Sequence, residues 1–180
     1  MSTTRYIALL RGINVGGNKM IKMADLRHLV ESLGYDDVKT VLASGNVAWD
    51  TENDDADVMR TMIEQAIETT FGFSVSVIVI PQAQIETLVE SDPFAGIEVT
   101  KDTRLYVTFL PKPPTSTLNI PYHAPDKDFS ILRVSDTEIC SVLTLSGKTR
   151  TTDSMNILEA EFGKNITTRN WNTVLKLENL

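Results

Sequence analysis

The stretch VKTVLASGNVAWD, residues 38–50, decides the fold of the first half of this chain. Strand-forming residues lie on both sides of Ser44-Gly45-Asn46, three residues of the types that favour a tight turn. We therefore predict two antiparallel strands, 38–43 and 47–50, that are joined as a hairpin.

Helix patterns flank the hairpin on both sides. Apolar residues recur at helical spacing over residues 23–33, before the hairpin, and again over residues 55–71, after it. The second helix has acidic residues in its first turn, where the helix dipole favours them, and ends before Gly72. Short apolar runs at 6–10 and 75–80 predict the outer strands of the module. The predicted element order is β-α-β-β-α-β.

The second half repeats this order of elements without residue-level similarity to the first half. The predicted elements are a strand at 105–110, a short turn or helix after the run 111–114, strands at 129–134 and 137–145, a helix at 153–162, a brief strand at 166–168 and a terminal helix at 171–180. The sequence thus predicts an α+β protein with two tandem ferredoxin-like (βαββαβ) subdomains and a C-terminal helix. The expected bounds are 1–80 and 104–180, with a linking helix and loop at 81–103.

The charge balance of the chain argues against non-specific binding to nucleic acid. A net charge of −7 and a pI of about 4.8 repel phosphate backbones. No apolar run approaches the ~18 residues that cross a bilayer, and the N-terminal segment lacks a signal-peptide pattern. We expect a cytoplasmic protein, a monomer rather than an oligomer, with neither nucleic acid nor membrane as a partner.

Topology brings two loops of the first module together. In a βαββαβ fold, the loop after the first strand and the turn of the hairpin lie at the same end of the sheet. Glycine N–H groups in these loops could form a concave anion site beside the start of a helix. The candidate ligand-binding residues are Arg11, Asn14, Gly16, Gly17, Lys19, Ser44, Gly45 and Asn46. Alternatively, these glycines only permit tight turns and the asparagines only bond to nearby backbone.

The same rule places residues 146–150 near residues 168–170 in the second module. Their cations could bind phosphate or carboxylate through charge-assisted hydrogen bonds. The second candidate anion site comprises Lys148, Arg150, Arg169 and Asn170. The run SGKT at 146–149 is similar to the end of a nucleotide-binding phosphate loop. Val142 occupies the position at which that motif requires its first glycine. We therefore reject a nucleotide-binding phosphate loop at this place. The alternative is a solvated loop.

Three ordered motifs resemble the bacterial domain-of-unknown-function family 1697. They are RGINVGGNKM with MADLRHLVESLGY at 11–35, VKTVLASGNV at 38–47 and TTRNWNTVLKL at 167–177. The resemblance spans nearly the whole chain and implies an α+β fold of two ferredoxin-like subdomains, but no reaction. The matching motif residues are Arg11, Gly12, Asn14, Val15, Gly16, Gly17, Ser44, Gly45, Asn46, Arg169, Asn170, Trp171 and Thr173.

Catalytic and metal-binding patterns are missing from the sequence. The two histidines have no companions at metal-ligand spacing, and no nucleophile triad can be assembled. The single cysteine, Cys140, lies in an apolar alternating run typical of a buried residue. We therefore expect no metal and no cofactor, and we lean away from an enzyme.

The leading functional hypothesis is a binding module for a small anionic ligand, with a phosphorylated metabolite or a nucleotide as the candidate class. One alternative is an interaction or structural protein that acts through an exposed sheet face or edge. The other is an enzyme of a type that its sequence does not reveal.

Overall fold

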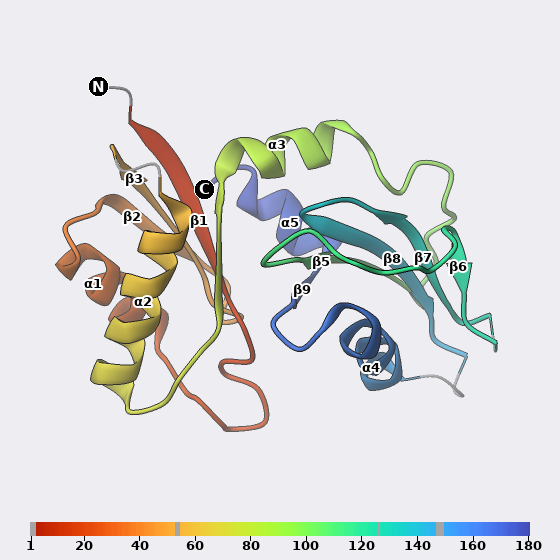
Figure 1. Ribbon diagram of the computed structural model, residues 1–180, viewed down its shortest axis with the longest axis horizontal. Coiled ribbons are helices and arrows are strands. Elements are labelled where there is room, and N and C mark those ends of the chain that lie inside the picture. The colour runs from red at the N-terminus through yellow and green to blue at the C-terminus, as the bar shows by residue number, and fades with distance from the viewer. Residues whose placement is uncertain (1–2, 53–54, 126, 147–149) are drawn as a thin grey trace. The chain divides into compact units, whose positions relative to one another are not determined.

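The computed structural model describes residues 3–52, 55–125, 127–146 and 150–180 (Figure 1). In these residues the chain is an α+β protein with five helices and two antiparallel sheets, one of four strands and one of five. It divides into two compact units. The first comprises the chain up to Glu90 together with Leu175–Leu180, and the second is Ser91–Val174. No helix in the described residues is long and apolar enough to cross a bilayer.

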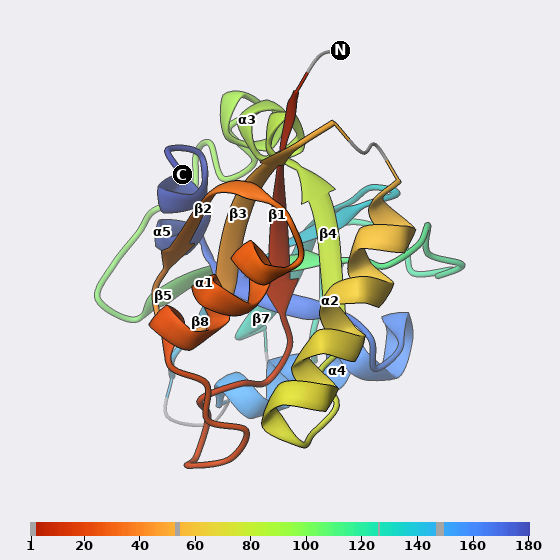
Figure 2. The ribbon, with the colours of Figure 1, turned by 90° about the vertical axis from the view of Figure 1, so that its left-hand side faces the viewer.

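The first unit contains one four-stranded sheet with strand order β2-β3-β1-β4. Figure 2 shows α1 and α2 on the same face of this sheet. The central strand β1 is fully buried over its last residues, and both of its neighbours are antiparallel to it. The elements are β1 (Thr4–Leu10), α1 (Met23–Ser32), β2 (Asp36–Val41), β3 (Asn46–Thr51), α2 (Ala56–Phe71) and β4 (Val77–Pro81).

The core of the first unit lies between the sheet and these two helices. Trp49 is fully buried in it and stacks on Tyr35, with the ring centroids 5.1 Å apart. The long helix α2 has defined ends: Asp55 accepts a hydrogen bond from the Val58 N–H at 3.0 Å, and Gly72 ends the helix with a left-handed conformation. These local signals are the ones from which the helix was predicted.

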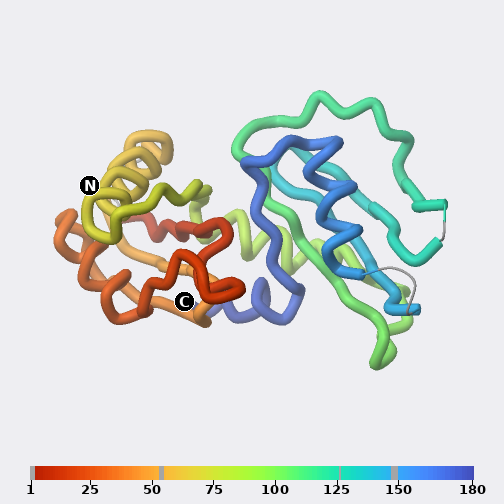
Figure 3. The backbone as a smooth tube through the Cα atoms, turned by 90° about the horizontal axis from the view of Figure 1, so that it is seen from below, coloured from red at the N-terminus to blue at the C-terminus, as the bar shows by residue number. Residues whose placement is uncertain are grey.

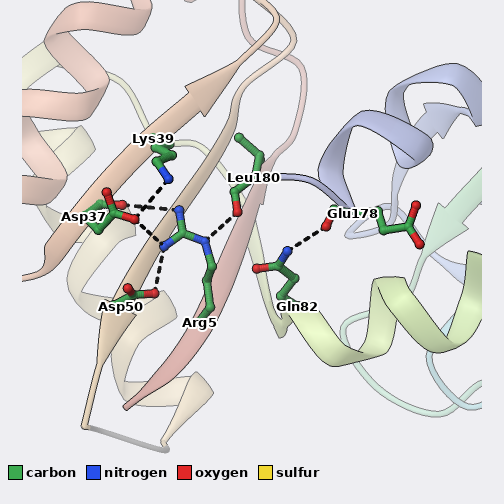
Figure 4. A network of polar contacts seen from close by, with 7 residues as sticks. All are labelled: Arg5, Asp37, Lys39, Asp50, Gln82, Glu178 and Leu180. Carbon is green, nitrogen blue, oxygen red and sulfur yellow. Dashed lines mark hydrogen bonds and ion pairs between the residues drawn. The ribbon is translucent and has the colours of Figure 1, made fainter.

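Two further segments belong to the first unit. Helix α3 (Gln82–Glu90) contacts β1 and β4. The last residues of the chain are held by two hydrogen bonds (Figure 4). Arg5 Nε donates to the Leu180 carbonyl at 2.8 Å, and Gln82 Nε2 donates to the Glu178 carbonyl at 2.8 Å. Our expected bounds put α3 in a linker and the last residues in the second subdomain, whereas these contacts group both with the first unit.

The second unit contains a five-stranded sheet with strand order β6-β7-β8-β5-β9. Its core includes Phe129, Ile131 and Leu143 from the sheet and Leu158 from α4. The elements are β5 (Thr103–Phe109), β6 (Tyr122–His123), β7 (Phe129–Val134), β8 (Glu138–Thr144), α4 (Thr151–Phe162), β9 (Thr167–Asn170) and α5 (Trp171–Leu177), the last of which runs on into the first unit.

The connection from β5 to β7 differs from the expected turn or helix. Residues 110–121 form an irregular loop, which Figure 3 shows as a long open path, and the two-residue strand β6 follows it. Proline explains the difference, because it lacks a backbone N–H and fixes its own φ angle. Four prolines lie in this loop, at 111, 113, 114 and 121.

Candidate functional site

The two glycine-containing loops of the first unit are in contact with each other. The Leu10 N–H at the end of β1 donates to the Gly45 carbonyl at 2.8 Å. Asn14 Nδ2 in the loop after β1 donates to the Ala43 carbonyl at 2.8 Å. Two segments about 30 positions apart in sequence therefore form one rim of the unit, as the topology requires.

Asn14 and Asn46 both use their side chains to hold backbone in place. Asn14 Nδ2 donates to the Ile21 carbonyl as well, and Asn14 Oδ1 accepts from the Ile21 N–H at 2.8 Å. Asn46 is fully buried, and its Nδ2 donates to the Val41 carbonyl at 2.8 Å and to Ser44 Oγ at 3.0 Å. Both hydrogens of each amide are therefore already donated. These contacts favour the structural alternative for the two asparagines.

The Gly16-Gly17 pair forms the tip of a small hairpin. Val15 and Asn18 pair across it, with the Asn18 N–H donating to the Val15 carbonyl at 3.1 Å. Both glycines have positive φ angles, 60° and 78°, as a type I′ turn requires. The tip is exposed, and Val15 retains 66% of its accessible surface. We find a solvent-exposed hairpin here, where the sequence predicted a concave cradle of N–H groups.

Gly45 is required by close packing. Its φ angle is +81°, and a Cβ atom placed on it would lie 2.7 Å from Ile13 Cδ1 and 2.9 Å from Leu10 Cβ. No real Cβ contact is that short, so any side chain at this position would push the end of β1 and the loop after it apart. Gly45 therefore sets the distance between the two loops.

The two predicted cations, Arg11 and Lys19, line one pocket of about 350 Å³. Lys19 Nζ donates to the Ser74 carbonyl at 2.7 Å, and the Arg11 N–H donates to the Ser76 carbonyl at 2.9 Å. The loop before β4 thus holds the ammonium group of Lys19 and the backbone of Arg11. The lining residues are Arg11, Lys19, Thr61, Glu64, Gln65, Glu68, Ser74, Val75 and Ser76.

The α2 wall of this pocket carries negative charge. Glu64 is engaged on both oxygens, because Oε1 accepts from the Val77 N–H at 2.9 Å and Oε2 accepts from Arg60 at 3.2 Å. Glu68, one turn further along α2, is exposed. Two cations and two carboxylates therefore line the same pocket. Over the described residues, no group of three or more His, Cys, Asp or Glu side chains is arranged to hold a metal ion.

The second predicted cluster does not form a shared cation site in the described part of the chain. Arg169 is buried, its Nη1 donates to Thr167 Oγ1 at 2.9 Å, and desolvation lowers its pKa to about 10. Arg150 is exposed and precedes α4, where its N–H donates to Asp153 at 2.8 Å. Lys148 lies outside the described residues.

Asn170, the fourth member of that cluster, lines a pocket of about 320 Å³ in the second unit. Arg104 lines the same pocket, but it belongs to no sequence motif and was not predicted as a site residue; it follows directly on Thr103 at the start of β5. The only signal in the sequence was a cation at the edge of an apolar strand. The lining residues are Val99, Thr103, Arg104, Leu105, Asn170, Trp171 and Asn172.

Comparisons with known proteins agree with the family resemblance. A family model described as "Protein of unknown function (DUF1697)" matches residues 3–139. The solved structure of the conserved bacterial protein SP0830 from Streptococcus pneumoniae superposes with a TM-score of 0.74 at 22% identity, covering 99% of this chain and 98% of that one. At this identity the similarity supports a common fold alone. No curated protein matches significantly.

Proposed function

This chain belongs to the DUF1697 family, and we propose that its first unit binds a small anionic ligand in the pocket that Arg11 and Lys19 line. The observation that carries the proposal is the convergence of these two cations on one pocket of about 350 Å³, a size typical of small-molecule sites. The ligand class that we propose is a phosphorylated metabolite or a nucleotide.

The α2 wall narrows the ligand class. Glu64 and Glu68 face the same pocket as the cations, and a ligand with negative charge alone would be repelled by them. Glu64 already has two hydrogen-bond donors, whereas Glu68 is exposed at the rim. A ligand with an anionic group toward Arg11 and Lys19 and an amino group toward Glu68 would satisfy both walls. Polar groups from Thr61, Gln65 and Ser74 supply neutral hydrogen bonds between the two poles.

The proposed fold subclass rests on strand order. In the first unit β2-β3-β1-β4 is the order that a split βαβ sandwich requires, and the second unit has β7-β8-β5-β9 in the corresponding positions with β6 added at the edge. We therefore interpret the two units as ferredoxin-like modules, the second of which lacks a helix between β5 and β7 in its described residues.

Titration calorimetry with phosphoethanolamine, inorganic phosphate and adenosine monophosphate tests the proposed function. We expect phosphoethanolamine to bind more tightly than phosphate, and Lys19→Gln to weaken its binding by about ten-fold, the effect of one charge-assisted hydrogen bond. Lys22→Gln is the matched control, because Lys22 is an exposed cation in the same loop that does not line the pocket.

Two results would contradict the proposal. The first is no heat of binding with either phosphoethanolamine or inorganic phosphate. The second is an equal loss of affinity in Lys19→Gln and Lys22→Gln, which would indicate attraction to the general charge of the loop. Glu68→Gln tests the proposed contact between the ligand's amino group and Glu68 separately from the binding of the anionic group. It should reduce the preference for phosphoethanolamine over phosphate while leaving the binding of phosphate at least as strong.

A further inference from the structure

We propose that the second unit has its own ligand site, for a planar ring that carries an anionic group, in the pocket that Arg104 and Trp171 line. This site lies entirely in residues of the second unit and does not depend on the Arg11 pocket. Its walls come from the first residues of β5 and from the junction of β9 and α5.

Arg104 is a half-buried cation that is held in place by backbone. Both hydrogens of Nη1 are donated, to the Lys101 carbonyl at 2.7 Å and to the Thr103 carbonyl at 2.9 Å. No hydrogen bond or ion pair joins its Nε or Nη2 to a described residue. The edge of the guanidinium formed by these two nitrogens is the part that binds carboxylate or phosphate oxygens in a bidentate manner. The arginine is therefore preoriented for an anion.

Trp171 supplies an aromatic surface next to this arginine. Its indole ring packs edge-to-face with Phe94, with centroids 5.1 Å apart and an interplanar angle of 70°. This contact fixes the ring, which remains half-buried and lines the pocket. A fixed, partly exposed indole is a favourable stacking partner for a planar ring.

The remaining polar groups suit the edge of such a ring. Asn170 Oδ1 accepts from the N–H and the hydroxyl of Thr173, at 2.9 and 3.0 Å, which leaves its Nδ2 as a donor. Asn172 is exposed at the rim and can both donate and accept. No acidic residue lines this pocket, in contrast to the Arg11 pocket. An anion therefore meets a cation and two amides here without a repelling carboxylate in the wall.

Fluorine NMR of the full chain labelled with fluorotryptophan tests this site directly. The chain has two tryptophans, and fully buried Trp49 in the first unit serves as the internal reference. The probes are adenosine monophosphate and naphthoate, which combine a ring with an anion. Adenosine and inorganic phosphate, which each offer one half of that combination, are the controls. We expect the two ring-bearing anions to shift the Trp171 signal and not the Trp49 signal, with affinities about ten-fold above those of either control.

Variants decide whether Arg104 binds the anion. Arg104→Gln should lower the binding affinity of both ring-bearing anions by about ten-fold. Adenosine monophosphate should then bind this variant no more tightly than adenosine does. Lys101→Gln, which removes a neighbouring cation outside the pocket lining, should have no effect. If Arg104→Gln melts at a lower temperature than the parent, Asn172→Ala replaces it as the test and should weaken binding of the ring-bearing anions.

Three results would overturn the site. They are an unmoved Trp171 signal at millimolar probe, equal affinity for adenosine and its monophosphate, and equal losses in Arg104→Gln and Lys101→Gln. Lys19→Gln leaves this site unchanged if the two pockets are separate, so failure of either proposal is visible without the other.

Discussion

Replacing Gly45 by alanine should destabilise the first unit more than any other glycine replacement in its loops. The left-handed φ angle of +81° costs a non-glycine residue about 1–2 kcal/mol. The added Cβ would also approach Ile13 Cδ1 to 2.7 Å and Leu10 Cβ to 2.9 Å, and overpacking of this kind costs about 1–3 kcal/mol. We therefore expect Gly45→Ala to lower the free energy of unfolding of the first unit by about 2–5 kcal/mol.

Urea unfolding followed by the fluorescence of buried Trp49, in a Trp171→Phe background, measures this loss in the first unit alone. Gly16→Ala is the matched control, because its φ angle is also positive, +60°, and a Cβ there meets no atom within 4 Å. Gly16→Ala should lower the free energy of unfolding only by the cost of the left-handed φ angle, about 1–2 kcal/mol.

A second variant isolates the contribution of overpacking to this loss of stability. Ile13→Val removes the Cδ1 atom that the new Cβ would strike, so the double variant Ile13→Val with Gly45→Ala should lose less stability than the sum of the two single losses. Equal losses in Gly45→Ala and Gly16→Ala, or strict additivity in the double variant, would refute the close approach of the two loops.

Two further predictions follow from ionisable groups. The hydrogen bond from Lys39, and the charges of Lys39 and Arg5, hold the pKa of Asp37 below its usual 3.8. The stabilising contribution of ionised Asp37 is therefore present above about pH 4 and is lost as the pH falls through the lowered pKa. In Asp37→Asn the free energy of unfolding should fall less steeply as the pH drops below about 4. The same acid dependence in the variant and the parent would contradict this. Burial raises the pKa of the Cys140 thiol to about 11, so a disulfide reagent at about pH 8 should react only as fast as the second unit opens. Modification at the rate of a small free thiol would show that this side chain is accessible.

The parts of the fold that could be predicted are those with local chemical signals. The hairpin around Gly45, the acidic start of α2 and its glycine end all combine residue type with periodicity. The contact between the loop after β1 and the hairpin turn then followed from connectivity alone. The prolines of residues 110–121 could have argued against a helix there, but the element order of the first half suggested one.

The role of individual polar residues was harder to predict, because a motif does not show what its side chains contact. Asn14 and Asn46 look like ligand-binding residues in the sequence, yet their amides hold backbone carbonyls. Arg169 looks like a surface cation, yet it is buried. Arg104 belongs to no sequence motif, and only the folded structure shows that it lines the same pocket as Trp171. Long-range contacts of this kind depend on sheet register, which no local pattern encodes.

The most direct test of the proposed function is a nitrogen–proton NMR titration of the full chain with phosphoethanolamine. Binding in the Arg11 pocket predicts saturable shifts of the amide signals of Arg11, Lys19 and residues 74–76, with little change at residues 103–105. Shifts that never saturate, or that persist unchanged in Lys19→Gln, would contradict the claim that these two cations form a ligand site.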